Sequence, residues 1–258
     1  MRAGLRWQIE RLSANATDLI RLWDQAPSGS TPRISLNTVT GLPAVVVGSA
    51  TPERWIRPSA GRGTPLGPTS SSLEDVEIDV VRRKSGGGAV VVSRDAQVWI
   101  DFWIPRGDVL WNDDVVNAAL WVGETWARAL VSLGVERSDL DIHAGRLVSS
   151  RWSDVVCFAG IGPGEVLVRR LKLVGVAQRR NSYGSWFQTV SLVDWDPKTI
   201  LATLDRLELG PDAHKSVEAE LTGAATGLRE VISKTSETLQ NQELIALVEN
   251  AVVAALPS

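Results

Sequence analysis

Cysteine and histidine are scarce in this sequence of 258 residues. The single cysteine, Cys157, has no partner for an internal disulfide, and it cannot supply the several thiolates of a structural zinc or iron–sulfur site. The two histidines, His143 and His214, lie far apart in the chain and offer little for a zinc site or a serine triad. We therefore expect no protein metal site, and a reducing compartment, the cytoplasm, as the location.

Charge of one sign and long apolar runs are also missing. The chain has 27 Lys+Arg and 30 Asp+Glu, a net charge of -3, so it has no sequence-wide basic field for nucleic acid or an anionic membrane. The longest apolar stretches, such as 43–47 and 89–92, fall far short of the roughly 20 residues that span a bilayer. Charges interrupt the apolar residues of Met1–Leu12, which argues against a signal peptide.

The residues that are present have the composition of an ordinary soluble protein, 44% hydrophobic and 22% charged. Apolar side chains at steps of three and four predict helices, and short β-branched runs bounded by Gly, Pro or polar residues predict strands. The expected helices cover residues 5–26, 112–133, 196–207, 212–235 and 241–255. The expected strands cover residues 43–48, 76–83, 88–93, 97–104, 155–159, 166–169, 171–179 and 186–193, and a loop is expected over 57–70.

This order of elements predicts an α/β (α+β) fold with a mixed, largely antiparallel sheet flanked by helices. The turn residues 94–96 predict a hairpin between the strands at 88–93 and 97–104. We expect one large domain, residues 1–210, with a short helical C-terminal tail, residues 211–258, packed on it. The eleven tryptophans are expected mainly in the core, with a minority lining an apolar ligand slot.

Residues 82–90, RRKSGGGAV, contain three successive glycines between two expected strands. Three glycines weaken a strand connection unless the backbone must approach something closely or adopt a positive φ. A ligand passing over the loop would explain them, with Arg82, Arg83 and Lys84 as donors for a carboxylate or phosphate. A flexible hairpin turn with a solvated basic flank explains the same residues equally well.

Residues 172–180, KLVGVAQRR, begin with a lysine on an expected strand. Strand alternation puts Lys172 on one face with Val174 and Val176, which turns an ammonium toward an apolar surface. A lysine in this position is costly unless an anion meets it. The alternative is an edge-strand lysine whose stem is buried and whose charge reaches solvent.

The two motifs, in this order and at this spacing, resemble those of the lipoate-protein ligase A family, and PAVVVG at 43–48 is similar to a strand of the same family. The resemblance implies the fold of biotin protein ligases and lipoyl or octanoyl transferases. It implies lipoate or octanoate as the substrate, ATP and Mg²⁺ as cofactors of a ligase acting through an acyl-adenylate, and 1–210 as an acyl-transfer catalytic domain. The implied acceptor is a lysine of a lipoyl domain in a 2-oxo acid dehydrogenase, or of the glycine-cleavage H protein.

The resemblance also assigns site residues. In the family the Gly-rich loop lies against the acyl chain, and the lysine matching Lys172 binds the acyl carbonyl and its activating group, which makes Lys172 the expected catalytic residue. The expected substrate-binding residues are Arg82, Arg83, Ser85, Gly86, Gly87, Gly88, Ala89, Gly175, Ala177 and Gln178.

Two segments depart from the family pattern. Ligases of this family commonly have His-Asp and then Gly-Asn after the glycine motif, where this chain has Val92-Ser93 and Asp95-Ala96. A His-Gly pair often follows the second motif, where this chain has residues 183–188, YGSWFQ. These substitutions make a catalytically silent acyl-binding homologue a third possible function, beside the two enzymes.

Cys157 separates the two enzymatic hypotheses. Cys157-Phe158 resembles the Cys-Phe motif of cysteine-dependent octanoyltransferases, in which the cysteine carries the acyl group as a thioester, an acyl carrier protein is the donor, and no ATP is needed. The alternative is a small buried core residue on a Val-Val-Cys-Phe strand. An ATP-dependent ligase and an octanoyltransferase using Cys157 therefore both remain open, with the ligase slightly favoured because both longer motifs match it.

Overall fold

The computed structural model describes residues 6–24, 30–49, 51, 78–203, 211–232 and 238–258. It contains two sheets. The strands are β1 (Gln8–Ala14), β2 (Arg33–Val39), β3 (Ala44–Val47), β4 (Asp79–Arg82), β5 (Val90–Val92), β6 (Gln97–Pro105), β7 (Leu140–Ile142), β8 (Val166–Val168), β9 (Leu171–Arg180) and β10 (Gly184–Leu192). The helices are α1 (Ala16–Arg21), α2 (Asn117–Ser132), α3 (Pro197–Leu201), α4 (Pro211–Thr222), α5 (Leu228–Val231) and α7 (Asn241–Ala254).

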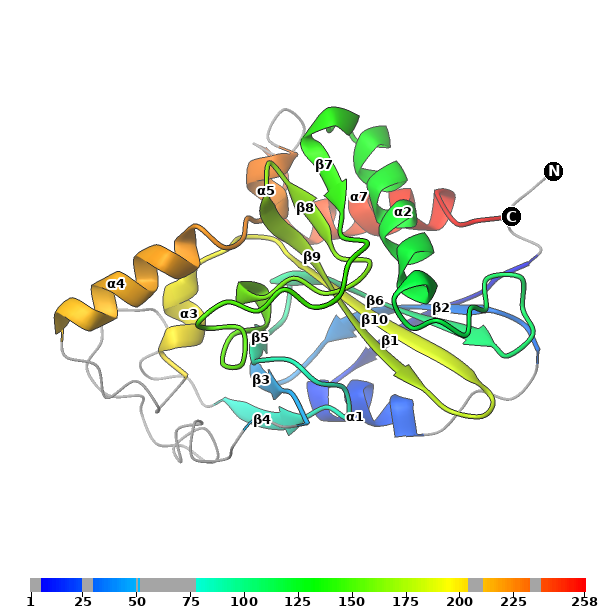
Figure 1. The fold of residues 1–258 in the computed structure, drawn as a ribbon, viewed down its shortest axis with the longest axis horizontal. Coiled ribbons are helices and arrows are strands. Elements are labelled where there is room, and N and C mark those ends of the chain that lie inside the picture. Colours follow the sequence, from blue (N-terminus) through cyan, green and yellow to red (C-terminus); the bar gives the residue numbers. More distant parts are fainter. Residues whose placement is uncertain (1–5, 25–29, 50, 52–77, 204–210, 233–237) are drawn as a thin grey trace.

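The larger sheet has seven strands in the order β1-β2-β6-β10-β9-β8-β7 (Figure 1). All its neighbouring strands are antiparallel except β1 and β2, which run parallel. The smaller sheet has the order β4-β3-β5, with β3 parallel to β4 and antiparallel to β5. The predicted mixed, largely antiparallel sheet with flanking helices is confirmed.

The elements form three layers (Figure 1). One hydrophobic core joins the larger sheet to α2 and α7 and includes Phe102, Trp126 and Val248. A second core lies between the two sheets and includes Leu19 of α1, Val46 of β3 and Trp99 of β6. The smaller sheet and α1 therefore cover the face of the larger sheet that α2 and α7 leave free.

Helix α2 confirms the helix expected over residues 112–133. Asp114 Oδ1 accepts hydrogen bonds from the backbone N–H groups of Val116 and Asn117, both at 2.8 Å. The helix therefore begins a few residues after residue 112, the expected start of the range 112–133. Gly134 ends it with φ +91°, a conformation that glycine adopts without steric cost.

The helix predicted over residues 5–26 is wrong for its first half. Residues Gln8–Ala14 form β1, and only Ala16–Arg21 form the helix α1, which Asn15 caps by accepting from the N–H of Asp18. The same apolar residues also suit a strand, since Leu12 and Ala14 pack toward the second core while Ser13 is exposed. Parallel pairing with β2, which had no predicted element, decides the outcome.

The predicted hairpin between residues 88–93 and 97–104 is also wrong. Strand β5 pairs with β3 in the smaller sheet, whereas β6 pairs with β2 and β10 in the larger one. The expected turn exists, with Asp95 at φ +58°, but it carries the chain from one sheet to the other. The triple glycine likewise joins β4 and β5 without pairing them, because β3 lies between them.

The strand expected over 155–159 is instead a single bridge at Val156, paired with Ala89, followed by a 3-10 turn over Cys157–Ala159. The short strand β7 had no predicted counterpart. The expected strands at 43–48, 166–169, 171–179 and 186–193 correspond to β3, β8, β9 and β10. The loop expected over 57–70 lies outside the described residues.

Of the helices expected near the C-terminus, one is divided and another is confirmed. The helix expected over 212–235 is divided into α4 and α5, because the intervening backbone pairs with β9: Lys172 N–H donates to Ala224 and Lys172 O accepts from Thr226. Helix α7 matches its prediction and has a capping box formed by Gln240 and Glu243. The helix expected over 196–207 is described only as α3, and the proposed boundary at residue 210 stays a prediction.

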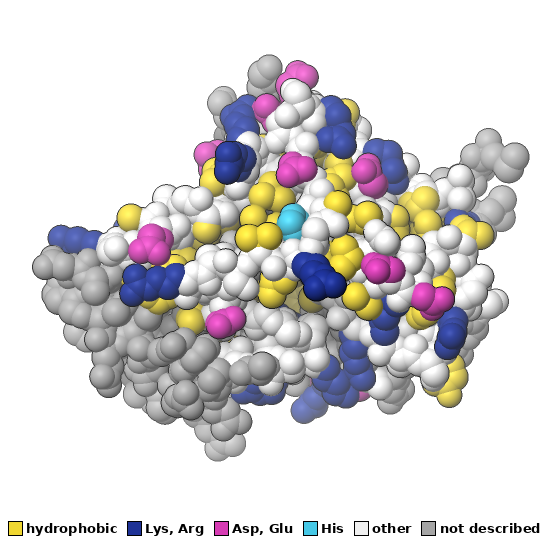
Figure 2. Space-filling view, viewed as in Figure 1, with side chains coloured by type: hydrophobic (Ala, Val, Ile, Leu, Met, Phe, Trp, Pro, Cys, Tyr) yellow, Lys and Arg dark blue, Asp and Glu magenta, His cyan; other side chains and the backbone are white. Residues whose placement is uncertain are grey.

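The visible face of the molecule carries interspersed acidic and basic side chains (Figure 2). Among the described residues, no group of three or more His, Cys, Asp or Glu side chains is placed to hold a metal ion. None of the helices in the described ranges is long and apolar enough to cross a membrane.

Candidate active site

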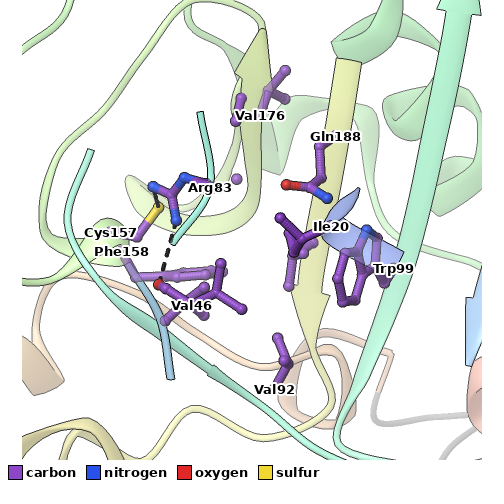
Figure 3. Close-up of a pocket in the computed structure, with 13 residues that line it drawn as sticks. Ile20, Val46, Arg83, Val92, Trp99, Cys157, Phe158, Val176 and Gln188 are labelled. Atoms are coloured by element: carbon purple, nitrogen blue, oxygen red, sulfur yellow. Dashed lines mark hydrogen bonds between the residues drawn. The ribbon is translucent and has the colours of Figure 1, made fainter. Parts of the chain in front are cut away.

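An apolar cavity lies between the two sheets, beside the Gly-rich loop (Figure 3). Its apolar walls come from β3, β5, β6, β9 and β10 and include Val46, Val90, Val92, Trp99, Val176 and Val190. Three polar side chains, Arg83, Cys157 and Gln188, also line it. An apolar cavity with a few polar groups is the usual form of a small-molecule site.

The Gly-rich loop is shaped by the protein's own backbone. Gly87 has φ +96°, and a Cβ added there would lie 2.8 Å from Arg83 Nη2. A Cβ at Gly88 would lie 2.5 Å from the backbone nitrogen of Val156, closer than folded proteins allow. At Gly86, by contrast, an added Cβ would meet nothing within 4 Å. Gly88 is therefore required by packing against backbone and Gly87 by its positive φ, and Gly86 is the one with free space.

Arg83 holds this loop in place. Its side chain is buried, and its Nη2 donates to the carbonyl oxygens of Gly86 at 2.8 Å and Gly88 at 3.0 Å. The same nitrogen lies 3.8 Å from Cys157 Sγ (Figure 3). Arg83 therefore connects the Gly-rich loop to the cysteine.

The neighbouring cations are engaged as well. Arg82 Nη1 donates to the carbonyl oxygens of Gly48 at 2.9 Å and Thr51 at 2.8 Å. Lys84 forms an ion pair with Asp24 near the surface. The three basic residues of the loop, 82–84, are therefore all bound to partners within the protein.

Lys172 is fully enclosed, with 1% of its surface exposed. Its Nζ donates to the carbonyl oxygens of Cys157 at 2.8 Å and Gly160 at 2.9 Å, and it lies 2.7 Å from Glu165 Oε2. An ammonium group has three N–H donors, so these three partners can use all of them. The anion that a buried lysine requires is supplied by the protein itself.

Glu165 is the main residue that the sequence interpretation missed. It is buried, and besides Lys172 its carboxylate accepts from the backbone N–H of Gly162 at 2.8 Å and of Val176 at 3.1 Å. The glutamate directly follows a Gly-Pro-Gly turn, residues 162–164. A glutamate directly before an apolar strand was the available signal for it.

The expected face of Lys172 is wrong because β9 contains an irregularity. Its register with β8 shifts next to Lys172, and Leu173 and Val174 both pack into the core beneath α2. Lys172 therefore turns toward the other face, where a Cβ at Gly175 would lie 3.5 Å from its Cε. Simple alternation cannot anticipate an extra residue in one strand of a pair.

Cys157 contacts both sequence motifs, residues 82–90 and residues 172–180. Its backbone N–H donates to Ala89 O at 2.9 Å, and its carbonyl oxygen accepts from Lys172. The residue is partly exposed and lines the cavity, and its thiol faces Arg83 (Figure 3). Reactive cysteines in proteins occur in such surroundings, beside a cationic donor and at a cavity.

Of the remaining predicted site residues, some line the cavity and others do not. Gly175 and Ala177 line the cavity. Gln178 follows them in β9 but lies near Val115 and Arg180 instead. Ser85 is buried, and its Oγ has no hydrogen-bond partner among the described residues.

The segments that depart from the family pattern also take part in the cavity. Val92 and Gln188 both line it, whereas Asp95 lies in the turn between the sheets and Tyr183 is exposed at the tip of the β9–β10 hairpin. Gln188 was noted in the sequence only as part of an unmatched segment, and its place in the cavity depends on the strand register.

A family model for the lipoyl protein ligase A/B catalytic domain matches residues 66–252, a range that contains both motifs. The chain belongs to this family. The comparison with curated protein sequences finds no match.

Solved structures of lipoate ligases share the fold. A bi-partite lipoate protein ligase from Thermoplasma acidophilum, studied with its E2 lipoyl domain, has a TM-score of 0.66 at 13% identity over 97% of this chain and 82% of that one. A T. acidophilum protein with bound lipoic acid has a TM-score of 0.63 at 14% identity, covering 97% and 84%. Lipoate-protein ligase A bound with ATP has a TM-score of 0.60 at 14% identity, covering 96% and 83%. Identities this low show a shared fold.

Proposed function

We propose that this protein attaches a lipoyl or octanoyl group to a lysine of a lipoyl domain, and that Cys157 carries the acyl group. The observation behind the proposal is the Cys157 thiol, which lines an apolar cavity beside Arg83. The cavity accounts for an aliphatic chain, and the thiol accounts for its transfer. Among proteins of this fold, one was solved with lipoic acid and another was studied with an E2 lipoyl domain, which supports the substrate class and the acceptor.

The proposed reaction has two steps. The Cys157 thiolate attacks the carbonyl carbon of an acyl thioester on a carrier protein; the bond to the carrier sulfur breaks, and the carrier leaves as a thiolate. The acceptor lysine amine then attacks the Cys157 thioester, an amide bond forms, and the Cys157 thiolate leaves while the amine proton passes to solvent. The Cys157 sulfur carries negative charge in both steps, as the attacking group and then as the leaving group. The positive charge of Arg83 lies beside this sulfur and stabilises that negative charge.

Lys172 has a different part in this scheme. Its ammonium holds the carbonyl of Cys157, and so it positions the 3-10 turn that presents the thiol. To bind an acyl carbonyl directly, as the family resemblance implies, it must exchange one of its three protein partners for the substrate. We propose that Lys172 acts first through the position of Cys157.

An ATP-dependent ligase is the second candidate. It is supported by the unpartnered hydroxyl of Ser85 at the Gly-rich loop, which fits a phosphate acceptor, and by the ATP complex of a protein with the same fold. ATP would supply the activation of a free carboxylate, with Mg²⁺ as its counter-ion. Within the Gly-rich loop the Ser85 hydroxyl would hold it, because Arg82 and Arg83 already bind carbonyl oxygens.

One experiment separates the candidates. The purified protein is incubated with octanoyl carrier protein and analysed by intact mass, and in parallel it is assayed for pyrophosphate exchange with ATP and either lipoate or octanoate. A hydroxylamine-labile octanoyl adduct that is absent from Cys157→Ser supports the thioester route, and exchange that survives Cys157→Ser supports the ligase. Acyl binding without adduct, exchange or transfer to a lipoyl domain or H protein identifies a silent homologue and refutes both enzymatic candidates.

A further inference from the structure

One side chain in the cavity has a polar atom without a partner. Gln188 lies on β10 and is 6% exposed, and its Nε2 has no hydrogen-bond acceptor among the residues that the structure describes. Its carboxamide points into the cavity, on the opposite side from Arg83 and Cys157 (Figure 3). Buried amide N–H groups in folded proteins almost always have an acceptor, so this one requires an explanation.

The residue that faces Gln188 across the strand pair has other partners. Asp101 pairs with Gln188 in the register of β6 and β10. Its Oδ1 accepts from the indole N–H of Trp99 at 2.9 Å, and its Oδ2 accepts from Asn37 Nδ2 at 2.9 Å. The carboxylate is therefore directed to Trp99 and Asn37, and the Gln188 amide is left facing the cavity.

The strand register places Gln188 away from the reactive end of the cavity. Gln188 is paired with Ala177, whereas Val190 is paired with Gly175, the residue that approaches Lys172. Two residues along a strand span about 7 Å. A chain whose carbonyl lies at the Cys157 and Lys172 end can reach Gln188 only with atoms several bonds farther along.

We propose that Gln188 determines which acyl chain the cavity accepts: its Nε2 donates a hydrogen bond to an acceptor atom, sulfur or oxygen, on the distal part of the chain. A saturated octanoyl chain covers this N–H with methylene groups and leaves it unpaired. A lipoyl group brings ring sulfur atoms, which are weak acceptors, to the same region. This inference rests on the proposed acyl-transfer function and specifies its substrate class.

The test compares three free acids by calorimetry on the whole protein: octanoate, lipoate, and an octanoate with a hydroxyl on the carbon that bears the nearer ring sulfur in lipoate. Gln188→Met is the informative variant because it keeps an unbranched chain of similar length and removes the amide. Gln8→Met, on the exposed edge strand β1, is the matched control. Gln188→Leu provides a second apolar replacement if the Met variant does not fold.

In the wild type we expect a preference for lipoate or the hydroxylated acid over octanoate. Gln188→Met or Gln188→Leu should tighten octanoate binding and weaken binding of the substituted acids, changing the ratio of dissociation constants by about tenfold. Gln8→Met should leave the ratio unchanged. The two substituted acids distinguish a sulfur from an oxygen acceptor.

The opposite results have distinct meanings. If the wild type transfers an acyl group to a lipoyl domain but the ratio is the same in both Gln188 variants, water satisfies the amide and the inference is wrong while the proposed function stands. If the wild type binds none of the acids and transfers no acyl group, the proposed function is wrong, and the inference about Gln188 is wrong with it.

Discussion

The buried pair of Lys172 and Glu165 offers the sharpest test of how this site is held together. Glu165→Gln keeps the size of the side chain and removes its negative charge. The Lys172 ammonium then retains the carbonyl oxygens of Cys157 and Gly160 but loses its only charged partner within 4 Å among the described residues. The substitution therefore leaves a charge in a place with 1% exposure.

The expected destabilisation is large. Removing one partner of a buried ion pair costs about 3–5 kcal/mol, because the remaining charge is neither solvated nor compensated. Glu165 also accepts from Gly162 N–H at 2.8 Å through the oxygen that meets Lys172, and a glutamine NH₂ at that position would face two donors. Replacing both charges, as in Glu165→Gln with Lys172→Met, should recover most of the loss, since the cost arises from the unpaired charge.

The assay is urea unfolding followed by tryptophan fluorescence, for which the chain has eleven reporters. A double-mutant cycle over wild type, Glu165→Gln, Lys172→Met and the double variant gives the coupling energy. Glu165→Gln within about 1 kcal/mol of the wild type would refute the pairing, because a buried unpaired ammonium cannot be that inexpensive. The cycle is also needed to interpret the activity of Lys172 variants. A single Lys172→Ala variant leaves the Glu165 carboxylate unpaired, so lower activity could come from lower stability as well as from slower catalysis.

Three further outcomes follow from the cavity and its loop. Gly88→Ala should destabilise the fold by about 1–3 kcal/mol, because its Cβ would lie 2.5 Å from backbone, whereas Gly86→Ala, with free space, should stay within about 0.5 kcal/mol of wild type in thermal unfolding. Cys157→Ser should abolish octanoyl transfer at a stability cost of around 1 kcal/mol; full transfer activity would contradict the thioester route. Arg83→Lys should slow transfer at least tenfold, measured by gel shift of a lipoyl domain, since one ammonium cannot reproduce the planar set of donors; an unchanged rate would rule out this role.

Local sequence was sufficient where the stabilising interactions are close along the chain. The α2 pattern predicted a helix because its apolar stripe, the capping residue Asp114 and Gly134 all act within a few residues of one another. Helix α7 and the strands β3, β9 and β10 were predicted for the same reason. The two motifs at 82–90 and 172–180 also pointed to the family, which the match over residues 66–252 confirmed.

The details that make a site depended on contacts between distant segments. Residues 8–14 form strand β1, where a helix was predicted, because they pair in parallel with β2. Strand β5 does not form the expected hairpin with β6 because it pairs with β3. Such pairings join segments that are distant in the sequence, so the apolar periodicity of a single segment cannot predict them.

Contiguous residues were enough to indicate the family and the mixed sheet, because motifs and short-range periodicity are properties of neighbouring residues. The positions of the candidate site residues relative to one another depended on tertiary structure. The irregularity in β9 turned Lys172 toward Glu165, the approach of two loops placed Arg83 beside Cys157, and the register of β10 put Gln188 in the cavity. A strand shift of one residue reverses the face that a side chain occupies, and that shift is set by the partner strand rather than by the strand's own sequence.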